Sequence, residues 1–143
     1  MAKTIAKILG VVFILVGILG FLAPGMLGMH LSLAHNLVHL ISGALALYFG
    51  FAGTLAVARL FCIVFGVVYA LLGVAGFLLG SSRAHVVAGV PATHHGAMDS
   101  SLLAVLPGAL ELALMDHLVH ILLGLVFLVG GFLTKADIDR AVD

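Results

Sequence analysis

The chain has 143 residues, of which 64% are hydrophobic and only 8% are charged, and its formal net charge is zero. Soluble globular domains are about one-quarter charged, so this composition excludes a water-soluble globule and predicts an integral membrane protein. The zero net charge gives no electrostatic support for a nucleic-acid partner. Because Cys62 is the only cysteine, an intrachain disulfide is also excluded.

Four apolar segments are long enough to cross a bilayer as helices, which takes about 20 residues each. The first segment stops at Ala23-Pro24-Gly25, a sequence that helices tolerate poorly. Membrane strands are a weaker interpretation, because the apolar runs do not alternate between apolar and polar residues and are longer than a barrel strand. We therefore predict an all-α membrane protein with four transmembrane helices, spanning about residues 4–22, 31–52, 59–80 and 109–133.

Lysine and arginine residues concentrate on one side of the predicted bundle. Because cytoplasmic loops of membrane proteins carry an excess of these residues, both termini and the connection between the second and third spans are predicted to be cytoplasmic. A longer loop, residues 81–106, is predicted to face outward as a flexible segment that carries His85, His94 and His95. The cytoplasmic basic residues are Lys3, Lys7, Arg59, Lys135 and Arg140, against Arg83 alone on the outer side.

The two halves of the chain repeat each other. Val11-Val12-Phe13 matches Val67-Val68-Tyr69, Leu37-Val38-His39 matches Leu118-Val119-His120, and the glycines that follow keep the same spacing. We therefore predict a tandem duplication of a two-helix unit, with repeats 1–58 and 59–143. Two-helix copies share one orientation and relate by an axis along the membrane normal. His39 and His120 should then lie at similar depth, in the outer half of the hydrocarbon layer.

The blocks His35-Asn36-Leu37-Val38-His39 and Asp116-His117-Leu118-Val119-His120 accompany a first span that ends in Gly-x-x-Gly-Phe. In these features the sequence resembles a family of small four-helix bacterial membrane proteins of unknown function, over nearly the whole chain. The resemblance implies the four-helix fold and the duplication, but no activity. The expected location is the bacterial inner membrane, or an internal membrane derived from it.

A cluster of polar residues lies at matching depth in the second and fourth spans. Ionisable groups inside a bilayer are costly, so they normally have partners or a functional role. One interpretation is a hydrogen-bonded clamp between the repeats, in which His39 bonds Asp116 and His120 bonds Asn36. The residues of the cluster are His35, Asn36, His39, Asp116, His117 and His120.

A second interpretation is binding of a tetrapyrrole. Histidines on facing helices can provide both axial ligands of a haem b iron, or each can ligate the magnesium of a chlorophyll. His39 and His120 are the candidate ligands, and His35 and Asp116 are the neighbours that would fix their orientation. A third interpretation is a transition-metal or proton site, for which the candidate metal ligands are His35, His39, His117 and His120.

The sequence contains no nucleophile paired with a base and no phosphate-binding loop, so we do not expect an enzyme. Its small size, its near absence of soluble mass and its glycine-rich helix faces favour a non-catalytic accessory protein, packed as a subunit against a larger membrane complex. The expected partners are thus the lipid bilayer and other membrane subunits. Tetrapyrrole binding is the alternative function, followed by the metal or proton site.

Overall fold

The computed structural model describes residues 1–84 and 98–135. Within them lie four helices that are long and apolar enough to cross a membrane, so the predicted class, a helical multi-pass membrane protein, is confirmed. Helices suit a bilayer because each satisfies its own backbone hydrogen bonds. The four helices are α1 (Ala2–Leu22), α2 (Leu33–Phe51), α3 (Leu55–Leu79) and α4 (Leu114–Phe132).

Hydroxyl side chains set the starts of two helices. Ser32 Oγ accepts the backbone N–H of His35 at 3.2 Å where α2 begins, and Thr54 Oγ1 accepts that of Val57 at 3.3 Å where α3 begins. Such caps satisfy backbone donors that have no partner within the helix. As a result, α3 begins at Leu55, earlier than the predicted position 59.

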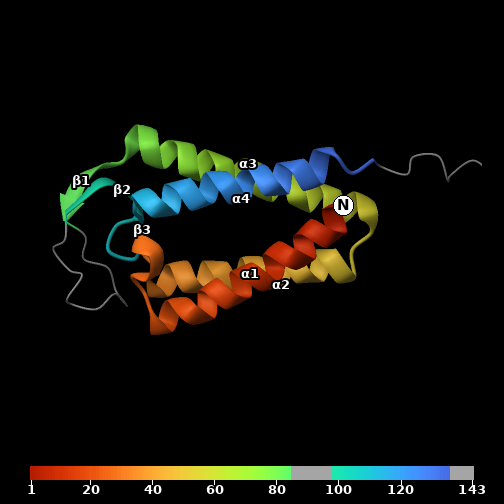
Figure 1. The fold of residues 1–143 in the computed structure, drawn as a ribbon, viewed down its shortest axis with the longest axis horizontal. Coiled ribbons are helices and arrows are strands. Elements are labelled where there is room, and N and C mark those ends of the chain that lie inside the picture. Colours follow the sequence, from red (N-terminus) through yellow and green to blue (C-terminus); the bar gives the residue numbers. More distant parts are fainter. Residues whose placement is uncertain (85–97, 136–143) are drawn as a thin grey trace, which may run out of the picture.

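A small antiparallel sheet lies at one end of the bundle (Figure 1). Its strands are β1 (Ser81–Ala84), β2 (Met98–Leu106) and β3 (Leu110–Leu112), and they pair in the order β1-β2-β3. The turn between β2 and β3 places Gly108 at φ +75°, a conformation that favours glycine.

The sheet corrects two expectations. Residues 81–84 and 98–106 form strands where an irregular loop was predicted, and His85, His94 and His95 lie outside the described residues. In addition, α4 begins at Leu114 and not near residue 109. The predicted span included β3 as well as α4, because the two elements belong to one apolar run. Apolar content alone does not distinguish a buried strand from a helix.

The helices form two antiparallel pairs, because α1 packs mainly against α2 and α3 packs mainly against α4 (Figure 1). The N-terminus, the connection between α2 and α3 and the end of α4 lie together at the end opposite the sheet. Aromatic rings fill the space between the pairs. Phe13 of α1 stacks on Tyr69 of α3 with ring centroids 5.3 Å apart, and Phe127 of α4 lies 5.9 Å from Phe13.

Glycines at equivalent positions make equivalent contacts in the two pairs. A Cβ atom added to Gly10 of α1 would lie 2.8 Å from Cγ of Leu47 in α2. A Cβ added to Gly66 of α3 would lie 2.7 Å from Cγ of Leu128 in α4. Both distances are too short for real atoms, so each pair depends on glycine for its close approach.

Nearer to the sheet, the two pairs again match in position but differ in chemistry. Gly20 of α1 faces the Asn36 side chain of α2, and Gly76 of α3 faces the His117 ring of α4. His117 therefore lies between α3 and α4, away from the space between the pairs. Its Nε2 atom donates to the carbonyl oxygen of Ser101 in β2 at 2.6 Å.

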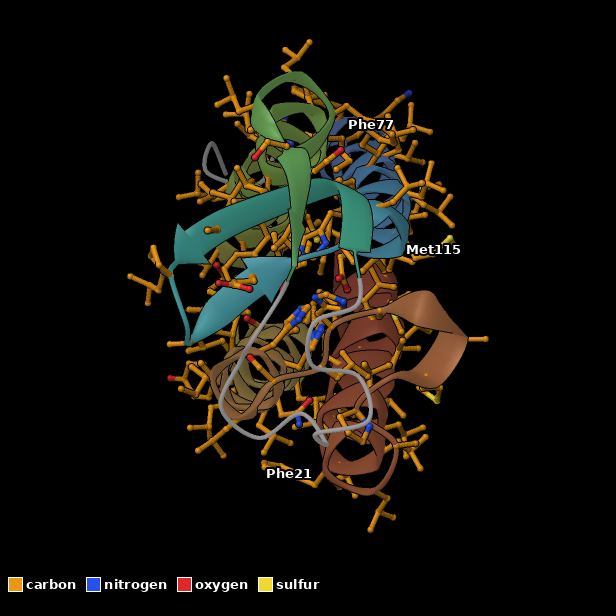
Figure 2. All side chains as sticks on the ribbon, turned by 90° about the vertical axis from the view of Figure 1, so that its left-hand side faces the viewer. Phe21, Phe77 and Met115 are labelled. Atoms are coloured by element: carbon orange, nitrogen blue, oxygen red, sulfur yellow. The ribbon has the colours of Figure 1, made fainter. Side chains whose placement is uncertain are left out.

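Apolar side chains project outward from all four helices, whereas nitrogen atoms gather near the middle of the molecule (Figure 2). Phe21 and Phe77 occupy equivalent positions of the two pairs and point to opposite sides. They are 49% and 44% exposed, as expected for side chains that contact lipid.

Candidate functional site

Three imidazole rings form a cluster between the helix pairs, near the sheet. The His35 ring stacks on His39 with centroids 4.6 Å apart and lies 5.9 Å from the His120 ring. Phe13 packs against His39 at 5.4 Å, and Tyr69 packs against His120 at 5.1 Å. The three imidazoles are buried, so α2 and α4 do bring His35, His39 and His120 together.

Hydrogen bonds to carbonyl groups fix the proton positions on two of the rings. His35 Nδ1 donates to the carbonyl oxygen of His30 at 2.7 Å, and His120 Nδ1 donates to that of Asp116. A carbonyl oxygen can only accept, so each Nδ1 atom carries the proton and each Nε2 atom of the neutral ring is an acceptor. His35 Nε2 is buried, and no partner for it lies in the described part of the chain.

The Asp116 carboxylate joins the two helix pairs through backbone groups. Its Oδ2 atom accepts the N–H of Ala113 at 2.7 Å, at the start of α4, and the N–H of His30 at 2.9 Å, from the connection between α1 and α2. Helix starts leave backbone donors unpaired, and a carboxylate is a strong acceptor for them. Asp116 therefore fixes the start of α4 and its position beside the first helix pair.

The pairing in this region differs from the predicted clamp. Asp116 Oδ2 accepts two backbone N–H groups, and Oδ1 has no hydrogen-bond partner among the described residues, so the carboxylate does not bond His39. Asn36 Nδ2 donates to the Leu31 carbonyl at 3.2 Å and not to His120. The sequence indicated which residues are buried, but the competing backbone groups at the helix starts decide their partners.

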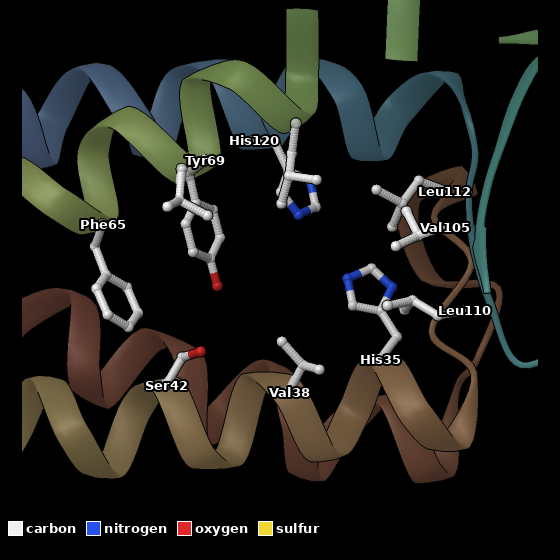
Figure 3. A pocket seen from close by; sticks show the side chains of 11 residues that line it. His35, Val38, Ser42, Phe65, Tyr69, Val105, Leu110, Leu112 and His120 are labelled. Carbon is white, nitrogen blue, oxygen red and sulfur yellow. The ribbon is translucent and has the colours of Figure 1, made fainter. Parts of the chain in front are cut away.

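A cavity of about 200 Å³ lies between α2 and α3, beneath β2 and β3 (Figure 3). We call it the α2–α3 pocket. The rings of His35 and His120 point into it, and so does Tyr69, whose hydroxyl is directed toward Ser42. Sequence reasoning missed Ser42, although its position seven residues after His35 places both side chains on one face of α2.

A second cavity, of about 160 Å³, lies between α1 and α4, beneath the short 3-10 turn η1 (Met26–Gly28). We call it the α1–α4 pocket. His35 and His120 line it as well, together with His39 and Asp116. The two pockets thus lie on opposite sides of the same imidazole cluster.

The space around the cluster does not match a tetrapyrrole. The His35 ring stacks on His39 and lies close to His120, so it occupies space beside both candidate axial ligands. The cavities of about 200 and 160 Å³ are also smaller than the roughly 300 Å³ at which pockets for drug-sized ligands begin. A haem or chlorophyll would therefore require these side chains to move.

The candidate metal ligands are only partly brought together. His35, His39 and His120 share the space between the pairs, whereas His117 faces α3 and bonds Ser101. Among residues 1–84 and 98–135, no group of three or more His, Cys, Asp or Glu side chains is arranged to hold a metal ion.

Fold and site together define a class: a four-helix membrane protein with buried imidazoles and two small pockets between its helix pairs. The chain belongs to the family described as domain of unknown function DUF4383, whose model matches residues 3–106. The match includes His35 and His39 and ends before α4. No curated protein and no solved structure matches the chain.

Proposed function

We propose that this protein is a non-catalytic membrane protein that binds a small lipid-soluble molecule in the α2–α3 pocket. One observation carries the proposal: the His35 ring, only 2% exposed, points into a cavity of about 200 Å³ with an Nε2 atom that has no partner in the described part of the chain. A buried polar atom without a partner costs about 1–3 kcal/mol, so a ligand that bonds it gains binding free energy.

The position of the pocket supports entry from the bilayer. Val38 of α2 and Val68 of α3 line the pocket and are themselves 42% and 47% exposed, so the cavity opens sideways between two membrane-spanning helices. Most of its other lining groups are apolar, such as Phe65, Leu72 and Leu112. Such walls suit a molecule that is already dissolved in lipid.

The test is occupancy of the purified protein. We expect mass spectrometry of gently solubilised protein to detect a bound small apolar molecule, and Val68→Trp to abolish it by filling the entrance. Leu71→Trp is the matched control, because Leu71 is 62% exposed on the same helix and does not line the pocket. Equal occupancy in wild type and Val68→Trp would refute the proposal.

The same purified protein also tests the two alternative functions, tetrapyrrole binding and metal binding. A Soret band that is lost in His39→Ala or His120→Ala would establish haem ligation and displace the proposal. Zinc or copper at one equivalent per chain, lost in the same variants, would establish a metal site. A colourless, metal-free protein with a bound organic molecule is the result that we expect.

We further propose a bacterial inner-membrane location with both termini cytoplasmic, and an origin by tandem duplication of residues 1–58. The basic residues Lys3, Lys7 and Arg59 lie in the half of the bundle opposite the sheet, which supports the orientation. The matched glycine contacts of the two pairs support the duplication. Cysteine labelling of single-cysteine variants in intact cells would test the orientation.

Association with a larger membrane complex stays a prediction. The glycine-rich faces that motivated it pack within the chain, α1 on α2 and α3 on α4, so they do not provide a docking surface. Co-purification of a stoichiometric partner in mild detergent would support the prediction, and a protein that migrates alone would contradict it.

A further inference from the structure

The α2–α3 pocket presents hydrogen-bond acceptors from both helix pairs. His35 of α2 and His120 of α4 have their Nδ1 protons committed to carbonyl oxygens, so both Nε2 atoms carry lone pairs. Both rings point into the pocket and toward each other (Figure 3). Neither ring can rotate to offer its N–H without breaking its bond to a carbonyl, so this part of the pocket is an acceptor site.

The rest of the pocket suits a flat apolar ring. Tyr69 and Phe65 provide aromatic surface, Val38, Leu72 and Leu112 are among the aliphatic lining residues, and the Ser42 hydroxyl faces that of Tyr69. An apolar cavity of roughly 150 Å³ is large enough for benzene, so about 200 Å³ has room for one substituted ring. The side opening between Val38 and Val68 leaves a path for a chain attached to that ring.

Resting on the proposed function, we propose that the α2–α3 pocket binds a lipid-soluble phenol, hydroquinones included, whose hydroxyl group donates to His35 or His120. The same ring oxidised to a quinone is a poor ligand, because its carbonyl oxygens would face the imidazole lone pairs. The imidazole end of the pocket therefore discriminates between hydroxyl donors and acceptors of the same shape. Rejection arises because a ligand without a donor leaves the buried Nε2 atom of His35 unpaired.

Three ligands of one shape test this selectivity. Wild-type protein in lipid nanodiscs is equilibrated by anaerobic dialysis with tetramethylhydroquinone, with tetramethylbenzoquinone, and with the dimethyl ether of the hydroquinone. We expect the hydroquinone to bind at least about tenfold more tightly than either of the other two. Equal affinities for the three ligands would overturn the proposed selectivity.

Replacement of the acceptors identifies the residues responsible. His35→Leu and His120→Leu should each reduce the preference for the hydroquinone at least several-fold. The matched control is His117→Asn, because His117 is buried on the same helix as His120 but does not line the pocket, and Asn36 is its counterpart in the other pair. The preference should survive in this control, and its persistence in both Leu variants would contradict the assignment.

A spectroscopic readout keeps the test independent of variant folding. In wild-type protein with ¹⁵N-labelled histidine, the Nε2 resonance of His35 or His120 should shift on addition of the hydroquinone, and not with the dimethyl ether. No shift at either atom, despite binding, would refute the hydrogen bond.

The outcomes separate this inference from the proposed function. If all three ligands bind alike and Val68→Trp blocks all of them, the pocket is a general apolar site and only the selectivity is wrong. If none of them binds and no native molecule co-purifies, the proposed function fails together with the inference.

Discussion

The α2–α3 and α1–α4 pockets are built from equivalent positions of the two helix pairs, yet they differ in polarity. Where α3 contributes Tyr69 to the first pocket, α1 contributes Phe13 to the second. Where α2 contributes Ser42, α4 contributes Leu123. The backbone framework is thus shared, but only the α2–α3 pocket carries a pair of hydroxyl groups.

The covers of the two pockets also differ. Strands β2 and β3 close the α2–α3 pocket through residues such as Val105 and Leu112, whereas the turn η1 closes the α1–α4 pocket through Met26 and Leu27. Because the helix packing is so similar, the residues that differ between the pairs set the chemistry of each pocket. The glycine contacts thus maintain the helix packing of both pairs, while a few side chains decide what each pocket can bind.

Substitutions of the glycines at the helix contacts should cause the greatest loss of stability. A Cβ at Gly124 would lie 2.6 Å from the backbone nitrogen of Ala70, and one at the equivalent Gly43 would lie 2.9 Å from the carbonyl oxygen of Gly10. Backbone atoms cannot yield as side chains do, so Gly124→Val and Gly43→Val should each lower the free energy of unfolding by about 3 kcal/mol. Reversible unfolding in mixed micelles, followed by circular dichroism, measures this loss.

Gly124→Val should be the more damaging of the two, because the contact at Gly124 is closer. Gly108→Ala is a useful reference, since nothing lies within 4 Å of a Cβ there and only the positive φ is strained. A harmless change at either Gly124 or Gly43 would show that the two pairs do not share one packing mode.

The next effect concerns the carboxylate that joins the pairs. Asp116→Ala removes the acceptor of two buried N–H groups, those of His30 and Ala113, and should lower the free energy of unfolding by about 2 kcal/mol. Asp116→Asn keeps one side-chain oxygen and should lose less than half as much. The same unfolding experiment distinguishes them, and equal losses would mean that the charge matters and the acceptor does not.

Removal of the hydroxyl groups that distinguish the α2–α3 pocket should have the least effect on stability. Tyr69→Phe and Ser42→Leu give the α2–α3 pocket the residues of its counterpart and remove the two hydroxyl groups that face each other. A double-mutant cycle should give a coupling of about 1 kcal/mol, the usual contribution of one hydrogen bond. Because Phe13 has no serine opposite it, Phe13→Tyr should destabilise the protein. A coupling near zero would remove the polar distinction between the pockets.

The amino-acid sequence determined the membrane class and the four helices, because insertion into a bilayer depends on the hydropathy of about 20 consecutive residues, which is a local property. It also indicated which polar residues are buried, since His35, Asn36, His39, Asp116 and His120 interrupt apolar helices. The predicted ends of the helices were less accurate. The capping bond of Thr54 lets α3 begin before the predicted position, and the apolar residues just before Leu114 form a strand.

Only the tertiary structure decided the partners of those polar residues. Asp116 bonds the backbone of His30, 86 positions away in sequence, because the fold brings the connection of the first pair beside the start of α4. The His35 ring is oriented by its bond to the His30 carbonyl, and the His117 ring by its contacts with α3 and the sheet. No local sequence pattern encodes these contacts. Local hydropathy fixes which segments enter the bilayer, whereas long-range packing and competition among hydrogen-bond donors fix which atoms face the pocket.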